Sequence, residues 1–352
     1  MIMYICLLIL ILFMYPFLRK RTMLVHGETI IFNNKKYIFI VSSILIVLLG
    51  LRGLSVGIDT INYNNIFNNI KLLSLPQLFE LKEEYGYSLL QFLVSKVFGN
   101  FQYLLIIVAA FYIGVVSYHI YKYSENPLLS YLLFVVYGFY SFAMSATRQT
   151  IAITLVMVAY EFIKEKKLFK FLVVVLLASS FHITALIFLP SYWFNKFNLN
   201  RKTILLFVLI GLIVIAIKGE LRMLINNFAR IEYAAIETGG DRMYIFMLIS
   251  TCIGIVFRKP FMAKHDNNKY LFYMMLASTI IMPVTQFHPA IMRLYYYYFI
   301  FMIIFIPNIL RAIKDKGIRV IGTLSYFIIG AILFFSSVIY INQLENYQFF
   351  WQ

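Results

Sequence analysis

The sequence predicts an all-α fold, a polytopic integral membrane helix bundle of about 10–12 spans with one short re-entrant or interfacial helix. Hydrophobic residues make up 62% of the 352 residues, and the mean hydropathy of +0.83 is far above that of soluble domains. Apolar runs recur along nearly the whole chain, each about as long as the ~20 residues that cross a bilayer core. Positive charges concentrate between these runs. Residues 1–352 are therefore expected to form a single transmembrane domain.

Each expected span is an apolar run bounded by polar residues. The segment 86–98, GYSLLQFLVSKVF, is amphipathic and too short to cross, so it is expected to be re-entrant or interfacial. The expected spans are roughly 2–18, 37–51, 101–120, 127–147, 149–163, 168–180, 183–197, 203–217, 243–257, 270–285, 291–310 and 318–341.

Charge gives the orientation. The first apolar run has no positive residue before it and is followed by Arg19–Arg21, which predicts an N-terminus outside a bacterial cytoplasmic (inner) membrane. In this arrangement the cytoplasmic loops hold 21 of the 31 Lys and Arg residues, and the outer side holds 10. The net charge of +16 is thus a topology signal and gives no reason to expect a nucleic acid partner.

The stretch Leu168–Asn195 is too long for one span and short for two. A single crossing would place the basic segment after it on the outside, so we predict a tight outward hairpin that turns near Phe181 and His182. The two larger outer loops are expected at 52–87 and 218–242, and the second is polar enough to cover an outward-facing site.

Three arginines lie at the outer ends of spans: Arg52, Arg148 and Arg293. Each could simply extend its guanidinium to the lipid headgroups. Around Arg148, however, the spacing of Ser145, Arg148, Gln149 and Ala152 places small and polar side chains on one helical face, which indicates a polar cavity inside the bundle. Guanidinium groups bind phosphate oxygens in bidentate fashion, so the three arginines would suit a lipid diphosphate.

A second stretch, LRGLSVGIDTINYNNIF (51–67), begins where the second expected span ends. Gly53 and Gly57 permit a tight turn or a close approach of the backbone. Asp59 precedes a helix-like pattern, so it is either an N-cap or a base or sugar-hydroxyl acceptor, with Tyr63 stacking nearby.

Two histidines are expected on the outer side. His182, at the predicted hairpin turn, is either a packed, hydrogen-bonded residue or a general base, since imidazole accepts a proton near neutral pH. His288 lies shortly before Arg293, and the tyrosines that follow are expected at the membrane interface or against sugar rings. We expect His182 to be the base rather than Asp59, with His288 third.

Motifs for other chemistry are missing from the sequence. It has no paired acidic motif for a divalent metal, no Cys/His cluster, no phosphate-binding glycine loop and no GxSxG motif. We therefore expect no metal and no cofactor.

Three motifs, in this order, carry a resemblance to a known family. LRGLSVGIDTINYNNIF, SATRQTIAIT and LLASSFHITALIFLPSYWF, separated by apolar spans, resemble the EpsG family of Wzy-type polysaccharide polymerases from about Ile44 to Pro307. The RQ pair followed by FH is the most specific part. The resemblance implies a metal-independent, inverting glycosyltransferase for O-antigen, capsule or exopolysaccharide. It would transfer a growing glycan from undecaprenyl diphosphate to a sugar hydroxyl of the next lipid-linked repeat unit, on the outer side of the membrane. A chain-length regulator is a further partner expected for such a polymerase.

Two other functions fit part of the pattern. A flippase for lipid-linked oligosaccharides would also need a cationic cavity, but its charges should be distributed through mid-span. A membrane acyltransferase could use an intramembrane histidine, but acyl-CoA would call for polar groups on the cytoplasmic side. Here the polar residues gather at the outer ends of the spans.

Overall fold

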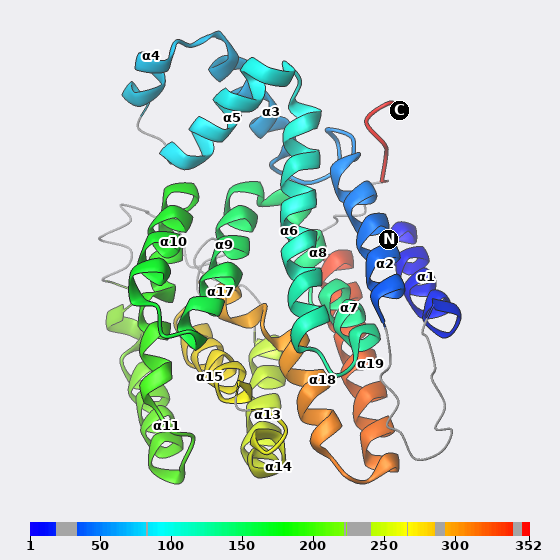
Figure 1. Ribbon diagram of the computed structural model, residues 1–352, viewed down its shortest axis with the longest axis vertical. Helices are drawn as coiled ribbons and strands as arrows, with labels where there is room; N and C mark the ends of the chain where they lie inside the picture. The colour runs from blue at the N-terminus through cyan, green and yellow to red at the C-terminus, as the bar shows by residue number, and fades with distance from the viewer. Residues whose placement is uncertain are drawn as a thin grey trace.

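Helices form almost all the regular structure of the computed structural model (Figure 1), which describes residues 1–18, 34–81, 84–221, 223, 241–265, 267–285, 293–340 and 347–352. Within these ranges, the β contacts amount to one isolated bridge between Arg52 and Phe349. The all-α prediction is confirmed. The helices are α1 (Ile2–Leu18), α2 (Lys35–Gly50), α3 (Thr60–Leu72), α4 (Leu75–Glu80), α5 (Tyr85–Phe98), α6 (Phe101–Tyr123), α7 (Pro127–Val136), α8 (Phe139–Ser145), α9 (Thr147–Lys164), α10 (Leu168–Phe181), η1 (Ile183–Lys196), α11 (Arg201–Ala216), α13 (Asp241–Val256), α14 (Arg258–Met262), α15 (Asn268–Thr285), η2 (Arg293–Tyr295), α17 (Tyr296–Phe299), α18 (Met302–Ala312) and α19 (Lys316–Tyr340).

Most helix boundaries follow the apolar runs of the sequence. The short helix expected at 86–98 is α5, and the spans expected at 37–51 and 149–163 are α2 and α9. By length and composition, α6 and residues Lys316–Ser337 of α19 can each cross a membrane, and two bent helix pairs raise the number to four among the described residues. The chain is therefore a helical membrane protein, and the total of about 10–12 spans stays a prediction.

Two of the expected spans are bent. The segment expected at 127–147 consists of α7 and α8, which meet at 47°. Gly138 at their junction has a φ of +79°, a left-handed conformation that glycine adopts without a Cβ clash. The segment expected at 291–310 likewise consists of η2 and α17 followed by α18, with a bend of 44°. Hydrophobicity alone could not predict these bends.

The hairpin predicted near Phe181 and His182 is present. α10 ends at Phe181, His182 is extended with a φ of −159°, and the 3₁₀ helix η1 begins at Ile183 and packs back against α10. A 3₁₀ helix rises about 2.0 Å per residue, so the 14 residues of η1 extend about 28 Å, close to the ~30 Å of a bilayer core. This geometry explains how so short a segment forms two antiparallel helices.

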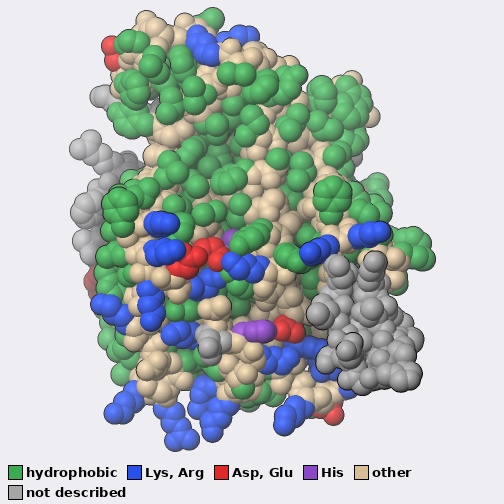
Figure 2. Space-filling view, in the orientation of Figure 1, with side chains coloured by type: hydrophobic (Ala, Val, Ile, Leu, Met, Phe, Trp, Pro, Cys, Tyr) green, Lys and Arg blue, Asp and Glu red, His purple; other side chains and the backbone are tan. Residues whose placement is uncertain are grey.

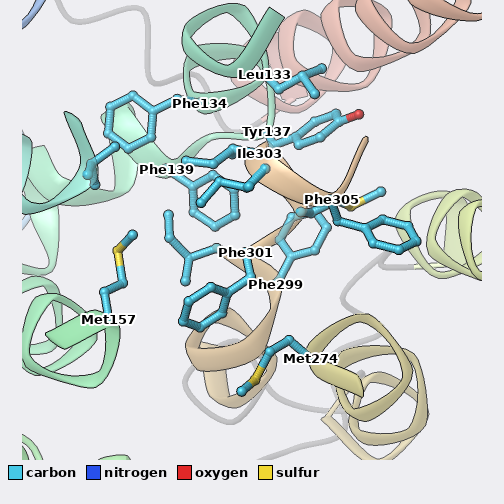
Figure 3. Packing of buried hydrophobic residues seen from close by; sticks show 14 of the residues in the cluster. Leu133, Phe134, Tyr137, Phe139, Met157, Met274, Phe299, Phe301, Ile303 and Phe305 are labelled. Carbon is cyan, nitrogen blue, oxygen red and sulfur yellow. The ribbon is translucent and has the colours of Figure 1, made fainter. Parts of the chain in front are cut away.

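The main hydrophobic core lies around α7, α17 and α18. Nearly every residue of α7 and of α18 is buried, so these helices have no polar face. Aromatic rings fill the space between them, including Phe134, Phe139, Phe299 and Phe301 (Figure 3). A helix that is apolar on all sides needs neighbours or lipid on all sides. α7 and α18 are the centre of the bundle.

A smaller unit, which we call the cap, comprises α3, α4 and α5 (Thr60–Phe98) and lies at one end of the bundle (Figure 1). Its own hydrophobic cluster includes Tyr63, Phe67 and Tyr87 and packs against α6 and Ile151 of α9. The cap corresponds to most of the loop expected at 52–87. The polar part of the other expected loop, 218–242, lies largely outside the described residues.

The end of the bundle opposite the cap is basic. α14, the end of α18 and the start of α19 lie there (Figure 1), and Figure 2 shows Lys and Arg side chains along this lower end. These basic segments lie at or near the ends of the expected spans 243–257, 270–285, 291–310 and 318–341. A cap outside and a basic end in the cytoplasm would follow the positive-inside rule, and this orientation stays a prediction.

Cysteine labelling tests this orientation. In a background without Cys6 and Cys252, Asn198→Cys lies between η1 and α11 and should not react with an impermeant thiol reagent in intact cells. Phe79→Cys in the cap is the matched position and should react, because Phe79 is exposed. Labelling of position 198 from outside would contradict the predicted orientation of the hairpin and of the spans after it.

Candidate active site

A polar cavity of about 120 Å³ lies beneath the cap, where four segments distant in the sequence meet. Its lining comes from the start of α3, the α8–α9 junction, the α10–η1 turn and η2. The lining residues are Asp59, Asn62, Tyr63, Ala146, Arg148, Gln149, His182 and Arg293. Six of them are residues that the sequence singled out as candidates, so the structure brings these together.

The α8–α9 junction positions Arg148 and Gln149. α8 ends at Ser145, and Ala146, with φ −94° and ψ 61°, interrupts the helix before α9 begins. The expected single helical face is therefore broken: Ser145 belongs to the preceding helix, where its Oγ accepts a hydrogen bond from the backbone N of Ile58. The break places Arg148 in the first turn of α9, at the cavity wall.

Gln149 is 3% exposed, and its Nε2 donates a hydrogen bond of 3.0 Å to the backbone oxygen of Arg293. This bond connects α9 to η2. The Oε1 atom is buried and has no hydrogen-bond partner among the described residues. A buried carbonyl in a cavity wall can accept a hydrogen bond from a ligand hydroxyl or N–H group.

His182 and Arg148 share one carboxylate, that of Glu84 at the N-terminus of α5. Glu84 Oε1 lies 2.6 Å from His182 Nδ1, and Oε2 lies 3.1 Å from Arg148 Nη1. The backbone N of Ile183 also donates to Oε1, at 3.3 Å. A carboxylate at Nδ1 holds the proton on that nitrogen and leaves Nε2 as a hydrogen-bond acceptor.

Glu84 reaches these partners because α5 packs directly on the end of α10. A Cβ on Gly86 would lie 2.2 Å from Ser180 Oγ and 2.9 Å from the Ser180 carbonyl carbon, so only glycine allows this approach. Nothing in the sequence singled out Glu84, since an acidic residue before a short amphipathic helix is usually solvated. Glu84 is recognised as part of the site only from its contacts with Arg148 and His182 in the folded chain.

Asp59 occupies the N-cap position of α3, but its side chain makes no capping hydrogen bond. The carboxylate lines the cavity instead. The backbone reaches this position through Gly57, whose φ is +95° and whose Cβ would lie 2.0 Å from the backbone oxygen of Met144. Glycine is therefore required where the chain crosses the end of α8.

Tyr63 is 5% exposed, and the Arg148 guanidinium lies 5.6 Å from its ring centroid, a cation–π distance. Burial raises the pKa of Tyr63, and the neighbouring Arg148 opposes this shift in part, so the phenol stays neutral. Tyr63, which was expected to stack near the site, is here in contact with Arg148.

Arg293 lines the cavity beside the ring of Phe142, with its guanidinium carbon 5.7 Å from the ring centroid. Within the described residues, no carboxylate forms an ion pair with it. His288, also a candidate, lies outside the described residues.

Arg52, the third arginine expected to bind substrate, does not line the cavity. It is 2% exposed, and its Nη1 and Nη2 donate to the backbone oxygens of Leu49 (2.5 Å) and Met144 (3.2 Å). Burial lowers its pKa to about 10, so the guanidinium keeps its proton at neutral pH. Both terminal nitrogens thus bind carbonyls at the ends of α2 and α8, so Arg52 has a structural role.

Fold and site together define a class: a helical membrane protein with a polar cavity at one end, where two arginines, a histidine and two carboxylates meet. Residues 35–351 match the EpsG family, so the chain belongs to the EpsG family. This confirms the resemblance carried by the three motifs and makes the chain a polysaccharide polymerase-like membrane protein, in coarse terms a glycosyltransferase. No curated protein and no solved structure gave a significant match.

The position of Arg52 predicts a loss of stability on substitution. Arg52→Met removes a hydrogen bond from the Leu49 carbonyl and one of the two that the Met144 carbonyl accepts, so we expect unfolding in detergent at a clearly lower temperature, with a cost of about 2–4 kcal/mol. Arg201→Met, an exposed site, is the control and should change stability by less than about 0.5 kcal/mol. A variant at position 52 that is fully stable but no longer binds lipid diphosphate would instead make Arg52 a binding group.

Proposed function

We propose that this protein polymerises a polysaccharide by transferring a growing glycan from undecaprenyl diphosphate to a sugar hydroxyl of the next lipid-linked repeat unit. The observation that carries the proposal is the convergence of Arg148, Arg293 and His182 on one cavity. The reaction would take place on the outer side of a bacterial cytoplasmic membrane, with the N-terminus outside.

The two arginines supply the anion site. A donor diphosphate gains negative charge as its bond to the sugar breaks, and guanidinium groups placed there stabilise that charge. Arg148 is 36% exposed at the cavity wall, and Arg293 faces the same space without a described acidic partner. Arginine suits this position because it presents two parallel N–H donors and does not lose its proton.

His182 is the proposed base. Its Nδ1 is held by Glu84, so Nε2 would take the proton from the acceptor hydroxyl. The hydroxyl oxygen bonds to the anomeric carbon, and the bond from that carbon to the diphosphate oxygen breaks, with the electron pair leaving on the diphosphate. Attack from the opposite face inverts the anomeric centre. The steps use only groups of the chain, so we propose that they need no metal.

Asp59 and Gln149 would hold the sugars. The Asp59 carboxylate makes no capping bond, and the Gln149 Oε1 has no described partner, so both can accept hydrogen bonds from hydroxyl or acetamido groups. A flippase or an acyltransferase has weaker support. A flippase needs no general base, an acyltransferase that uses a histidine would need its polar groups on the cytoplasmic side, and the family is one of polymerase-like proteins.

Substituting Arg148 by lysine tests the anion site. Arg148→Lys keeps the charge but loses the bidentate geometry, and a charge-assisted bond contributes about 1.5–3 kcal/mol, so we expect polymerisation to fall about 10–100-fold. The assay uses membranes with a purified lipid-linked repeat unit. Arg201→Lys, at the far end of the bundle, is the same chemical change and should leave the rate as it is. Normal polymer length and yield from Arg148→Lys would mean that Arg148 contacts lipid headgroups and does not bind the donor.

A pair of substitutions separates the two candidate bases. His182→Ala should lower the rate about 10²–10⁴-fold, the usual contribution of a general base. Asp59→Asn should have a smaller effect, since a carboxylate is a weaker general base than an imidazole near neutral pH. His265→Ala, an exposed histidine at the other end, is the control. A wild-type rate in His182→Ala together with an inactive Asp59→Asn would assign the base to Asp59.

A further inference from the structure

One carboxylate serves both of the groups that the proposed reaction needs. Glu84 accepts from His182 through Oε1 and pairs with Arg148 through Oε2, so each of its oxygens has a different partner. The side chains of Glu84, His182 and Arg148 are 19%, 28% and 36% exposed. They are ordered by contacts within the protein yet open to a ligand in the cavity.

The carboxylate and a donor diphosphate would compete for the same guanidinium. In the structure Arg148 Nη1 binds Glu84, which carries a single negative charge. A diphosphate carries more charge and presents several oxygens to the planar guanidinium. The pair is partly exposed, so separating it costs little. A bound diphosphate therefore draws Arg148 away from Glu84.

The cap favours this exchange. Glu84 belongs to the cap, whereas Arg148 and His182 belong to α9 and to the α10–η1 turn. The cavity of about 120 Å³ is smaller than ligand sites of ~300–1,000 Å³, so donor and acceptor need more room than the structure offers. Loss of the contact between Glu84 and Arg148 removes one of the contacts that hold the cap on the bundle.

We propose that Glu84 is a positioning residue that couples donor binding to the base. When the diphosphate binds Arg148, Glu84 loses its contact with Arg148 and keeps only its hydrogen bond to His182. This inference rests on the proposed function. Without the donor, Arg148 neutralises part of the charge of the carboxylate. With the donor, the full charge acts on His182, fixes the proton on Nδ1 and stabilises the imidazolium that forms when Nε2 takes the acceptor proton.

Other ionisable groups surround this site and stay constant in the test. Asp59, Tyr63 and Arg293 face the same cavity. Tyr297 is hydrogen-bonded at 2.9 Å to Thr184, two residues after His182. Because none of these is changed in variants of Glu84, a difference from wild type reports on Glu84.

The test is Glu84→Gln, which keeps the size of the side chain and removes its charge. Purified protein is assayed for binding of a short-chain polyprenyl diphosphate and, separately, for turnover of a lipid-linked repeat unit. We expect diphosphate binding about two- to fivefold tighter, the range for a partly exposed ion pair, because Arg148 has lost its competitor. Turnover should fall about tenfold or more, because His182 has lost its orienting carboxylate.

Glu80→Gln removes the same charge from an exposed position of the cap and should change neither quantity. If Glu84→Gln does not fold, Glu84→Asp takes its place, since the shorter side chain cannot reach both partners. Glu84→Asp should likewise bind the diphosphate more tightly and turn over more slowly. Weaker diphosphate binding together with lower turnover would mean a merely structural role and overturn the inference, with the proposed function intact. A wild-type protein that neither binds the diphosphate nor extends a glycan would overturn both.

Discussion

The buried guanidinium of Arg52 is the contact on which the arrangement of the site depends. α2 and α8 end close together, and each leaves backbone oxygens without partners within its helix. Arg52 donates to one from each helix, Leu49 and Met144, and Thr60 adds a second bond of 3.1 Å to Met144. The start of the cap is therefore bonded to the break before α9. Since Asp59 lies in the same turn and Arg148 just beyond the break, this contact sets the distance between two walls of the cavity.

Close backbone approaches also hold the cap against the bundle, and they require glycine at two positions. Gly57 lies against the end of α8 and Gly86 against the end of α10, and a Cβ at either would clash. The residues 347–352 add a third contact: Gly53 donates to Gln348 and Phe350 donates to Leu51, which holds the strand-like stretch after α2. The cap is thus attached at its beginning, by the turn at Arg52, and again where α5 begins. Between these attachments its aromatic cluster packs against α6 and Ile151 of α9.

Hydrophobic runs and charge were enough to predict the helices, because burial in a bilayer demands about 20 apolar residues and basic loops set the orientation. The bends at Gly138 and before α18 were not predictable, since they depend on packing rather than on hydropathy. In the site, Arg148, His182 and Asp59 were found because polar residues stand out at the ends of apolar runs. Arg52 was misplaced by the same reasoning, since its neighbours in sequence do not show that its donors point at carbonyls. Glu84 was missed because its partners are 64 and 98 residues away.

Arg52 and Arg148 show what decides whether an arginine in such a chain holds the fold or binds a ligand. Both lie at the end of an apolar run and both are charged at neutral pH. Arg52 is 2% exposed, and the acceptors of its terminal nitrogens are main-chain carbonyls that cannot move without unwinding a helix. Arg148 is partly exposed, and its acceptor is a side-chain carboxylate of the cap. An incoming anion can replace a carboxylate of like charge, but it cannot replace a carbonyl that closes a helix end. The exchangeable partner, rather than the arginine itself, is what favours Arg148 as the proposed binding group.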